Sequence, residues 1–136
     1  MAIASGRVYQ LACPNGWFLG IDHGDGWKSE YYHLSNPRGE LIGTWVSVGT
    51  YLGEAGNTLP CGGSSNGPHV HLSILYGTVP QPGPGVLRPY YPVSGMQFGN
   101  YTITAGATAF SGTWRTLAGA TVITNWGCCL TSSTTV

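Results

Sequence analysis

The sequence predicts an all-β, loop-rich protein, and three observations support this fold class. Short runs rich in tyrosine, tryptophan, threonine and valine alternate with turn residues, as strands do. Glycine is frequent, with 22 among 136 residues, which suits a chain with many tight turns. No segment carries the helical period of apolar residues over a useful length. The length corresponds to one domain with its own core.

The expected strands follow one another from the first residue, separated by recognisable turns. Residues 24–26 contain Asp-Gly, a dipeptide typical of tight hairpins. Residues 56–67 form a glycine-rich loop, and the proline-rich residues 78–92 cannot form a helix or a central strand. We expect Trp27 and Trp45 to pack against the sheet. The expected strands are residues 1–8, 16–23, 27–34, 45–49, 51–53, 69–75, 101–104 and 120–124.

Composition excludes several classes of partner. Only 7% of the residues are charged and the formal net charge is zero, so neither a nucleic-acid footprint nor a polybasic membrane patch is expected. No apolar run approaches membrane-spanning length, and no signal peptide is recognised. The four cysteines, Cys13, Cys61, Cys128 and Cys129, favour an exported protein with at least one disulfide. Buried thiols in a cytosolic protein are the alternative.

Three of the four histidines gather in two short stretches. His69 and His71 are two residues apart in a strand-like run, so their side chains point to the same face. His33 follows Tyr31 and Tyr32 in an earlier strand. The pair alone would favour two surface histidines on an edge strand, and the third histidine weakens that interpretation. The pattern indicates a candidate metal or proton-transfer site.

Residues 67–71, GPHVH, together with Tyr32-His33-Leu34 and the earlier Gly26-Trp27, resemble the M23 family of zinc metallopeptidases. The chain is most similar to the β-lytic/staphylolysin branch of secreted, cell-wall-lytic endopeptidases. The stretches HGDGWKSEYYHL, LPCGGSSNGPHVHLSILYG and FGNYTITAG occur in the family's order and span residues 5–106.

The resemblance implies an antiparallel sheet that forms an open groove, of the M23 or duplicated-hybrid-motif type, and one Zn²⁺. It implies hydrolysis of peptide bonds, glycine-rich ones in this branch, in the cross-links of bacterial peptidoglycan. By position, His71 matches a metal ligand, and His69 and His33 match the two catalytic histidines. Cys13 and Cys61 match a family disulfide, whereas the pairing of Cys128 and Cys129 is left open. Residues 79–89 match an insertion.

The family takes two further zinc ligands, a His and an Asp, from a segment that precedes the strand matched by residues 5–8. Asp22 resembles that ligand motif, but Phe18 stands where its partner histidine belongs. We therefore interpret Asp22 as a turn-flanking residue and His23 as a surface or hairpin residue, and count neither as a ligand. With His71 alone, this chain should hold zinc weakly or not at all.

Two functional interpretations follow, and whether the chain is an enzyme is left open between them. One is an M23-type peptidase domain over residues 1–127, present here without its N-terminal ligand segment, with residues 128–136 as a flexible tail. The other is a metal-free, non-catalytic cell-wall-binding module on the same scaffold. A generic secreted β-domain with incidental histidines is the weakest alternative. We expect a secreted monomer whose partner is peptidoglycan, and for the 136-residue chain by itself substoichiometric zinc and no cell-wall lysis.

Overall fold

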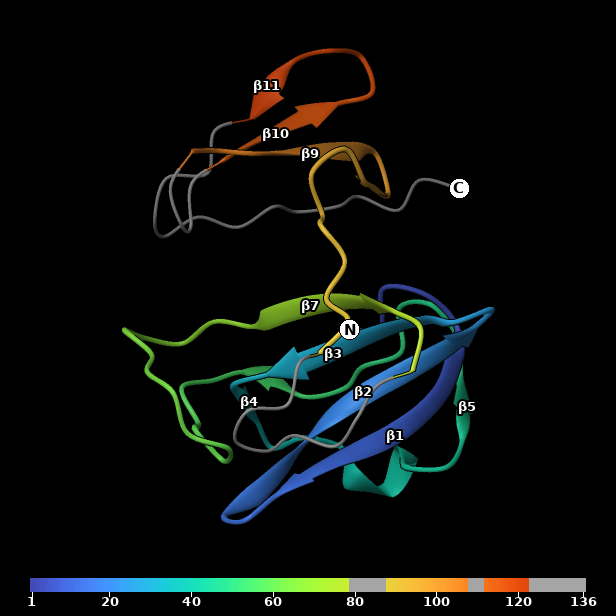
Figure 1. Ribbon diagram of the computed structural model, residues 1–136, viewed down its shortest axis with the longest axis vertical. Coiled ribbons are helices and arrows are strands. Elements are labelled where there is room, and N and C mark those ends of the chain that lie inside the picture. Colours follow the sequence, from blue (N-terminus) through green and yellow to red (C-terminus); the bar gives the residue numbers. More distant parts are fainter. Residues whose placement is uncertain (79–87, 108–111, 123–136) are drawn as a thin grey trace. The chain divides into compact units, whose positions relative to one another are not determined.

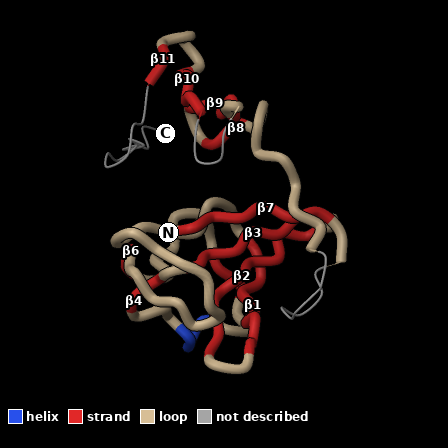
Figure 2. The backbone as a smooth tube through the Cα atoms, turned by 60° about the vertical axis from the view of Figure 1, so that its left-hand side comes forward, coloured by secondary structure: helices blue, strands red, loops and turns tan. Residues whose placement is uncertain are grey.

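The computed structural model describes residues 1–78, 88–107 and 112–122. The chain divides into two compact units, Met1–Tyr91 and Pro92–Val136. The described strands pair only in antiparallel fashion, and the sheets do not close into a barrel (Figure 1). Helical structure in the described ranges is limited to one 3₁₀ turn, η1 Gly39–Leu41 (Figure 2). The predicted all-β class is confirmed.

The first unit is built on a five-stranded sheet in the order β5-β1-β2-β3-β7. A second pair, β4 with β6, lies beside it in the same unit (Figure 2). The sheet strands are β1 Gly6–Cys13, β2 Gly16–Gly24, β3 Trp27–Tyr32, β5 Trp45–Val46 and β7 His71–Tyr76, and the pair is β4 Leu34–Ser35 and β6 Glu54–Ala55.

One face of this sheet supplies the apolar core. Leu19 opposes Tyr31 and Ile21 opposes Ser29 across β2 and β3, so these side chains share a face. A core cluster forms where buried residues of the loops and the N-terminal segment pack on that face. The members of this cluster are Ala2, Val8, Leu19, Ile21, Tyr31, Leu34, Val46 and Leu52.

The predicted hairpin turn at residues 24–26 is confirmed. Gly24, Asp25 and Gly26 all have positive φ, the left-handed conformation that an Asp-Gly turn supplies. Asp22 accepts a hydrogen bond from the Gly24 amide at 3.0 Å and pairs with Lys28 at 3.1 Å. Burial opposes ionisation of Asp22, but these contacts lower its pKa overall. Asp22 therefore braces the turn, as the sequence indicated.

The sheet extends beyond β7 through the short segment at residues 88–91. Leu75 and Tyr90 form an antiparallel bridge, and the Tyr91 amide donates to the Ile74 carbonyl at 2.8 Å. On the face opposite the core, the Arg88 guanidinium pairs with buried Glu30 on β3. Burial raises the pKa of Glu30, against the opposing influence of the Arg88 charge. This buried pair ties the returning segment to the middle of the sheet.

The second unit carries a four-stranded sheet in the order β11-β10-β9-β8. Its strands are β8 Gln97–Phe98, β9 Tyr101–Ala105, β10 Gly112–Thr116 and β11 Thr121–Val122. Trp114 on β10 makes edge contacts with Phe98 and Tyr101, at ring-centroid distances of 6.1 and 6.4 Å. These three aromatic rings pack against one another within the second unit.

Several expected boundaries are wrong. The first strand begins at Gly6 rather than at residue 1, residues 51–53 are not a strand, and β8 and β10 were not anticipated. Trp45 does not pack against the sheet, because 64% of its surface is exposed. The extent of a peptidase-like domain, residues 1–127, stays a prediction.

Cys128, Cys129 and residues 79–87 lie outside the described residues. Among the described residues, no helix has the length and apolar character needed to span a membrane.

Candidate functional site

His33 lies in an unusual backbone conformation between β3 and β4. Its φ is +65°, a left-handed value that only a few per cent of non-glycine residues adopt and that is enriched at functional sites. The residue is 3% exposed. This twist ends the β3 ladder at Tyr32 and turns the imidazole away from the regular alternation of the strand. The predicted continuous strand over residues 27–34 is therefore interrupted at this histidine.

His69 and His71 reach the same place from the glycine-rich loop and the start of β7. His71 opposes Tyr32 across the β3–β7 ladder, and the His69 amide donates to the Gly56 carbonyl at 2.9 Å. Gly56 lies so close to the chain at His33 that an added Cβ would collide with the Ser35 hydroxyl. Both His69 and His71 are exposed.

The structure brings the three predicted histidines together. The His33 ring centroid lies 4.6 Å from that of His69 and 5.9 Å from that of His71. The rings of His33 and His71 are inclined by 26°. Three side chains from two separate stretches of sequence thus share one small region at the end of β3 and the start of β7.

Two of these histidines are held in one tautomer by backbone carbonyl oxygens. Nδ1 of His33 lies 2.8 Å from the Thr58 carbonyl oxygen, and Nδ1 of His69 lies 2.8 Å from the Gly67 carbonyl oxygen. A carbonyl oxygen can only accept, so each Nδ1 carries the proton. On each neutral ring the lone pair is therefore on Nε2, the form that a general base or a metal ligand requires.

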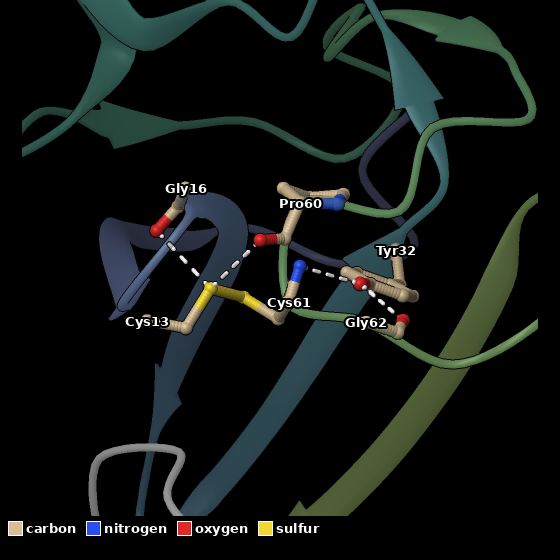
Figure 3. The surroundings of a disulfide bond; sticks show 6 residues. All are labelled: Cys13, Gly16, Tyr32, Pro60, Cys61 and Gly62. Carbon is tan, nitrogen blue, oxygen red and sulfur yellow. Dashed lines mark hydrogen bonds between the residues drawn. A yellow bond between two sulfur atoms is a disulfide. The ribbon is translucent and has the colours of Figure 1, made fainter.

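The loop that carries the partners of these histidines is anchored by a disulfide and a tyrosine. Cys13 and Cys61 form the disulfide that the family resemblance implied, with 5.6 Å between their Cα atoms (Figure 3). The Tyr32 hydroxyl accepts from the Cys61 amide at 2.7 Å and donates to the Gly62 carbonyl at 2.9 Å. The Tyr32 ring also contacts His33, at a centroid distance of 4.4 Å.

Sequence reasoning gave Tyr32 no role, and the structure shows that it joins this loop to His33. Its position immediately before the site histidine was a visible signal. The identity of its partners was not visible, because they are backbone groups of a distant loop.

The electrostatic environment disfavours the charged form of His71. Burial lowers its pKa, and the nearby His33 and His69 lower it further because imidazolium charges repel one another. At neutral pH His71 is therefore an uncharged imidazole with a lone pair available.

The described residues do not fit a complete zinc site. Among them, no group of three or more His, Cys, Asp or Glu side chains is arranged to hold a metal ion. Asp22 bonds to the Gly24 amide and pairs with Lys28. Neither contact joins it to the three site histidines. The role of His71 as a metal ligand therefore stays a prediction.

The fourth histidine, His23, lies in the arm of the hairpin as expected, but it is not a surface residue. It is half-buried, and both ring nitrogens have partners: Nδ1 lies 2.9 Å from the Ser5 carbonyl oxygen and Nε2 lies 2.8 Å from the Ser29 hydroxyl. The alternative of a surface histidine was wrong because these partners come from the N-terminal segment and β3.

Comparisons with known proteins place the chain among peptidases. A model of peptidase family M23 matches residues 1–82. The chain is 30% identical over 98 residues to Protease LasA of Pseudomonas aeruginosa, covering 70% of this chain and 21% of that protein. It is 35% identical over 97 residues to Beta-lytic metalloendopeptidase of Lysobacter enzymogenes, covering 68% of this chain and 48% of that protein. The chain therefore spans about a fifth to about half of the length of these relatives.

Proposed function

This chain belongs to peptidase family M23, and on that premise we propose that it acts in the hydrolysis of peptide bonds in bacterial cell-wall peptidoglycan. The proposal extends to glycine-rich cross-links, the substrate that the β-lytic/staphylolysin resemblance implies. The two relatives named a protease and a metalloendopeptidase support peptide hydrolysis as the reaction class. The Cys13–Cys61 disulfide supports an extracellular location.

The observation that carries the proposal is the pairing of His33 with His69. Their rings are 4.6 Å apart, and both have Nδ1 committed to a backbone carbonyl oxygen. In our proposal one Nε2 takes a proton from the attacking water, and a histidine of the pair returns a proton to the leaving amine. Rings held in one orientation favour this chemistry, because proton transfer requires the ring nitrogen to lie within hydrogen-bond distance of the atom that gives or takes the proton.

Zinc dependence is part of the same proposal, with His71 as a ligand. Its exposed position beside the pair and its neutral state at neutral pH support that role. Because the described residues do not complete a ligand set, we assign steps only to the histidines. The remaining ligands, in this proposal, come from sequence that precedes the strand at residues 5–8.

The second candidate function is a non-catalytic cell-wall-binding module. The incomplete ligand set favours it. The hydrogen bonds of Nδ1 in His33 and His69 favour the catalytic proposal over the binding module, because binding alone does not need two imidazoles in one tautomer.

The test uses the protein expressed from the longest reading frame that contains this sequence, supplied with Zn²⁺ and purified peptidoglycan with glycine cross-bridges. We expect new amino termini, identified by mass spectrometry, and loss of their release in His33→Ala and His69→Ala variants. Binding to walls without new amino termini would establish the binding module instead. For the 136-residue chain alone, substoichiometric zinc by elemental analysis and no lysis are expected.

A further inference from the structure

The strand registers place a row of side chains directly beside His71 on the face of the sheet opposite the core. His71 opposes Tyr32, and the next pair on the same face is Ser73 with Glu30. Because alternate residues of a strand share a face, the row continues in register across β2 to β1. Its members are Tyr9, Gly20, Glu30 and Ser73.

This row is covered, whereas His71 beside it is exposed. Glu30 points away from the core and would meet solvent on a bare sheet, yet it is only 2% exposed. The Tyr9 ring lies directly on Gly20, where an added Cβ would collide with it. The Tyr9 hydroxyl then donates to Glu30 Oε1 at 3.3 Å. The face thus changes from open to filled within one residue pair of His71.

Arg88 covers the other end of the row from the short edge segment beyond β7. That segment runs beside β7, since the Tyr76 amide donates to the Pro89 carbonyl at 3.1 Å. The Arg88 side chain therefore crosses β7 to pair with Glu30 on β3, and it is 8% exposed. The wall, defined as Tyr9, Glu30 and Arg88, spans the sheet from β1 to the edge segment.

Resting on the proposed peptide hydrolysis, we propose that this wall determines specificity by limiting the size of the substrate residue bound beside His71. A peptide that extends from His71 along β7 passes over Ser73, whose small side chain is half-buried, and there meets the wall. Glycine has no side chain to collide with it, whereas leucine does. The wall resists displacement, because moving Arg88 away leaves the Glu30 charge buried without that partner.

The wall selects by size rather than by charge. The carboxylate of Glu30 and the guanidinium of Arg88 neutralise each other, and both side chains are nearly inaccessible to solvent. A charged substrate group therefore finds no exposed counter-charge on the wall. What remains for a substrate to meet is its bulk.

The test uses the protein expressed from the longest reading frame that contains this sequence, supplied with Zn²⁺. Its substrates are a blocked oligoglycine peptide and the peptides in which one glycine is replaced by leucine. In the wild type we expect kcat/KM to fall about tenfold or more for leucine at one position beside the cleaved bond. In Glu30→Ala/Arg88→Ala, which removes both charges together, the ratio of leucine to glycine kcat/KM at that position should rise about tenfold or more.

The matched control is Glu30→Leu/Arg88→Met, which removes the same charges but keeps the bulk of the wall. This variant should retain the wild-type ratio. An equal rise in both double variants would assign the effect to the lost charges and overturn the proposal. An unchanged ratio in the alanine variant would also overturn it.

A second variant tests the same space without disturbing the ion pair. Ser73→Leu places bulk between His71 and the wall, and the half-buried position lies outside the core cluster. We expect kcat/KM for the oligoglycine peptide to fall about tenfold or more. A variant that cleaves and binds oligoglycine as the wild type does would contradict the wall.

Binding of the same peptides, measured by calorimetry, separates this proposal from the proposed function. Discrimination between glycine and leucine in binding, without cleavage, would support the wall and overturn the proposed hydrolysis. Cleavage that is indifferent to leucine at every position would overturn the wall and leave hydrolysis standing. Absence of both cleavage and binding would overturn both.

Discussion

At the scale of single residues, His71 gives the most direct test of the electrostatics of the site. Its imidazole is affected by burial and by two neighbouring histidines, and all three influences lower its pKa. A lowered pKa means that the ring gives up its proton more easily and stays neutral to a lower pH than an ordinary histidine. We expect its NMR titration midpoint below about 6.5, the value of an unperturbed imidazole.

Two variants separate the causes of this shift. His69→Gln removes one neighbouring charge and should move the midpoint of His71 upward, whereas His23→Gln, away from the cluster, should leave it unchanged. A midpoint above that of a model histidine peptide would show that the lowering effect of burial and repulsion is absent.

Sequence reasoning could identify the three histidines, because residue type and spacing are visible in the chain. It could not identify Thr58 and Gly67 as the partners that set their tautomers. Those partners act through carbonyl oxygens, which every residue has, so no side chain marks them. Nor could it anticipate the positive φ of His33, since histidine adopts that conformation only when its surroundings impose it.

At the scale of elements, the loop over residues 56–67 is held on the sheet by two different kinds of bond. The Cys13–Cys61 disulfide constrains the unfolded chain, while the Tyr32 hydroxyl binds the folded loop at Cys61 and Gly62 (Figure 3). The two contributions act on different states of the chain. They can therefore be separated by experiment.

We expect replacement of both cysteines by serine to lower the free energy of unfolding by about 4 kcal/mol, from the closure entropy of the 48-residue separation. Urea unfolding, compared with the oxidised wild type, measures this change. In the folded variant the amide of residue 61 should remain protected from exchange, because the Tyr32 bond persists. Tyr32→Phe should give the opposite pattern, with the disulfide retained and that protection lost. Equal loss of protection in both would mean that the disulfide alone positions the loop.

The short elements were the least predictable part of the fold. β8 and β6 have two residues each, too few to show an alternating pattern. β10 contains glycine, arginine and two threonines around Trp114, a composition that a turn shares. By contrast, β2 was predicted almost to its ends, because a run of apolar residues leads into an unambiguous glycine turn.

At the scale of the whole molecule, each compact unit has its own sheet, and all three site histidines belong to the first. The core cluster lies within residues 2–52, and the buried pair of Arg88 with Glu30 also lies inside the first unit. The matched family model ends at residue 82, before Arg88. The segment at residues 88–91 therefore belongs to the same compact unit as the matched residues.

A chain ending at Tyr91 should therefore fold by itself and keep the resonances of His33, His69 and His71. A chain ending at Gly77 loses Arg88 and the edge segment, which leaves Glu30 buried without that partner. We expect it to be less stable than the longer fragment by about 3 kcal/mol in urea unfolding, the scale of a broken buried pair. Burial already raises the pKa of Glu30, and removal of the Arg88 charge raises it further. A group with a raised folded-state pKa favours the folded state more strongly as pH falls, so acidification from pH 7 to pH 5 should recover part of the loss. If the two fragments are equally stable at pH 7, the Arg88–Glu30 pair does not tie the edge segment to the sheet.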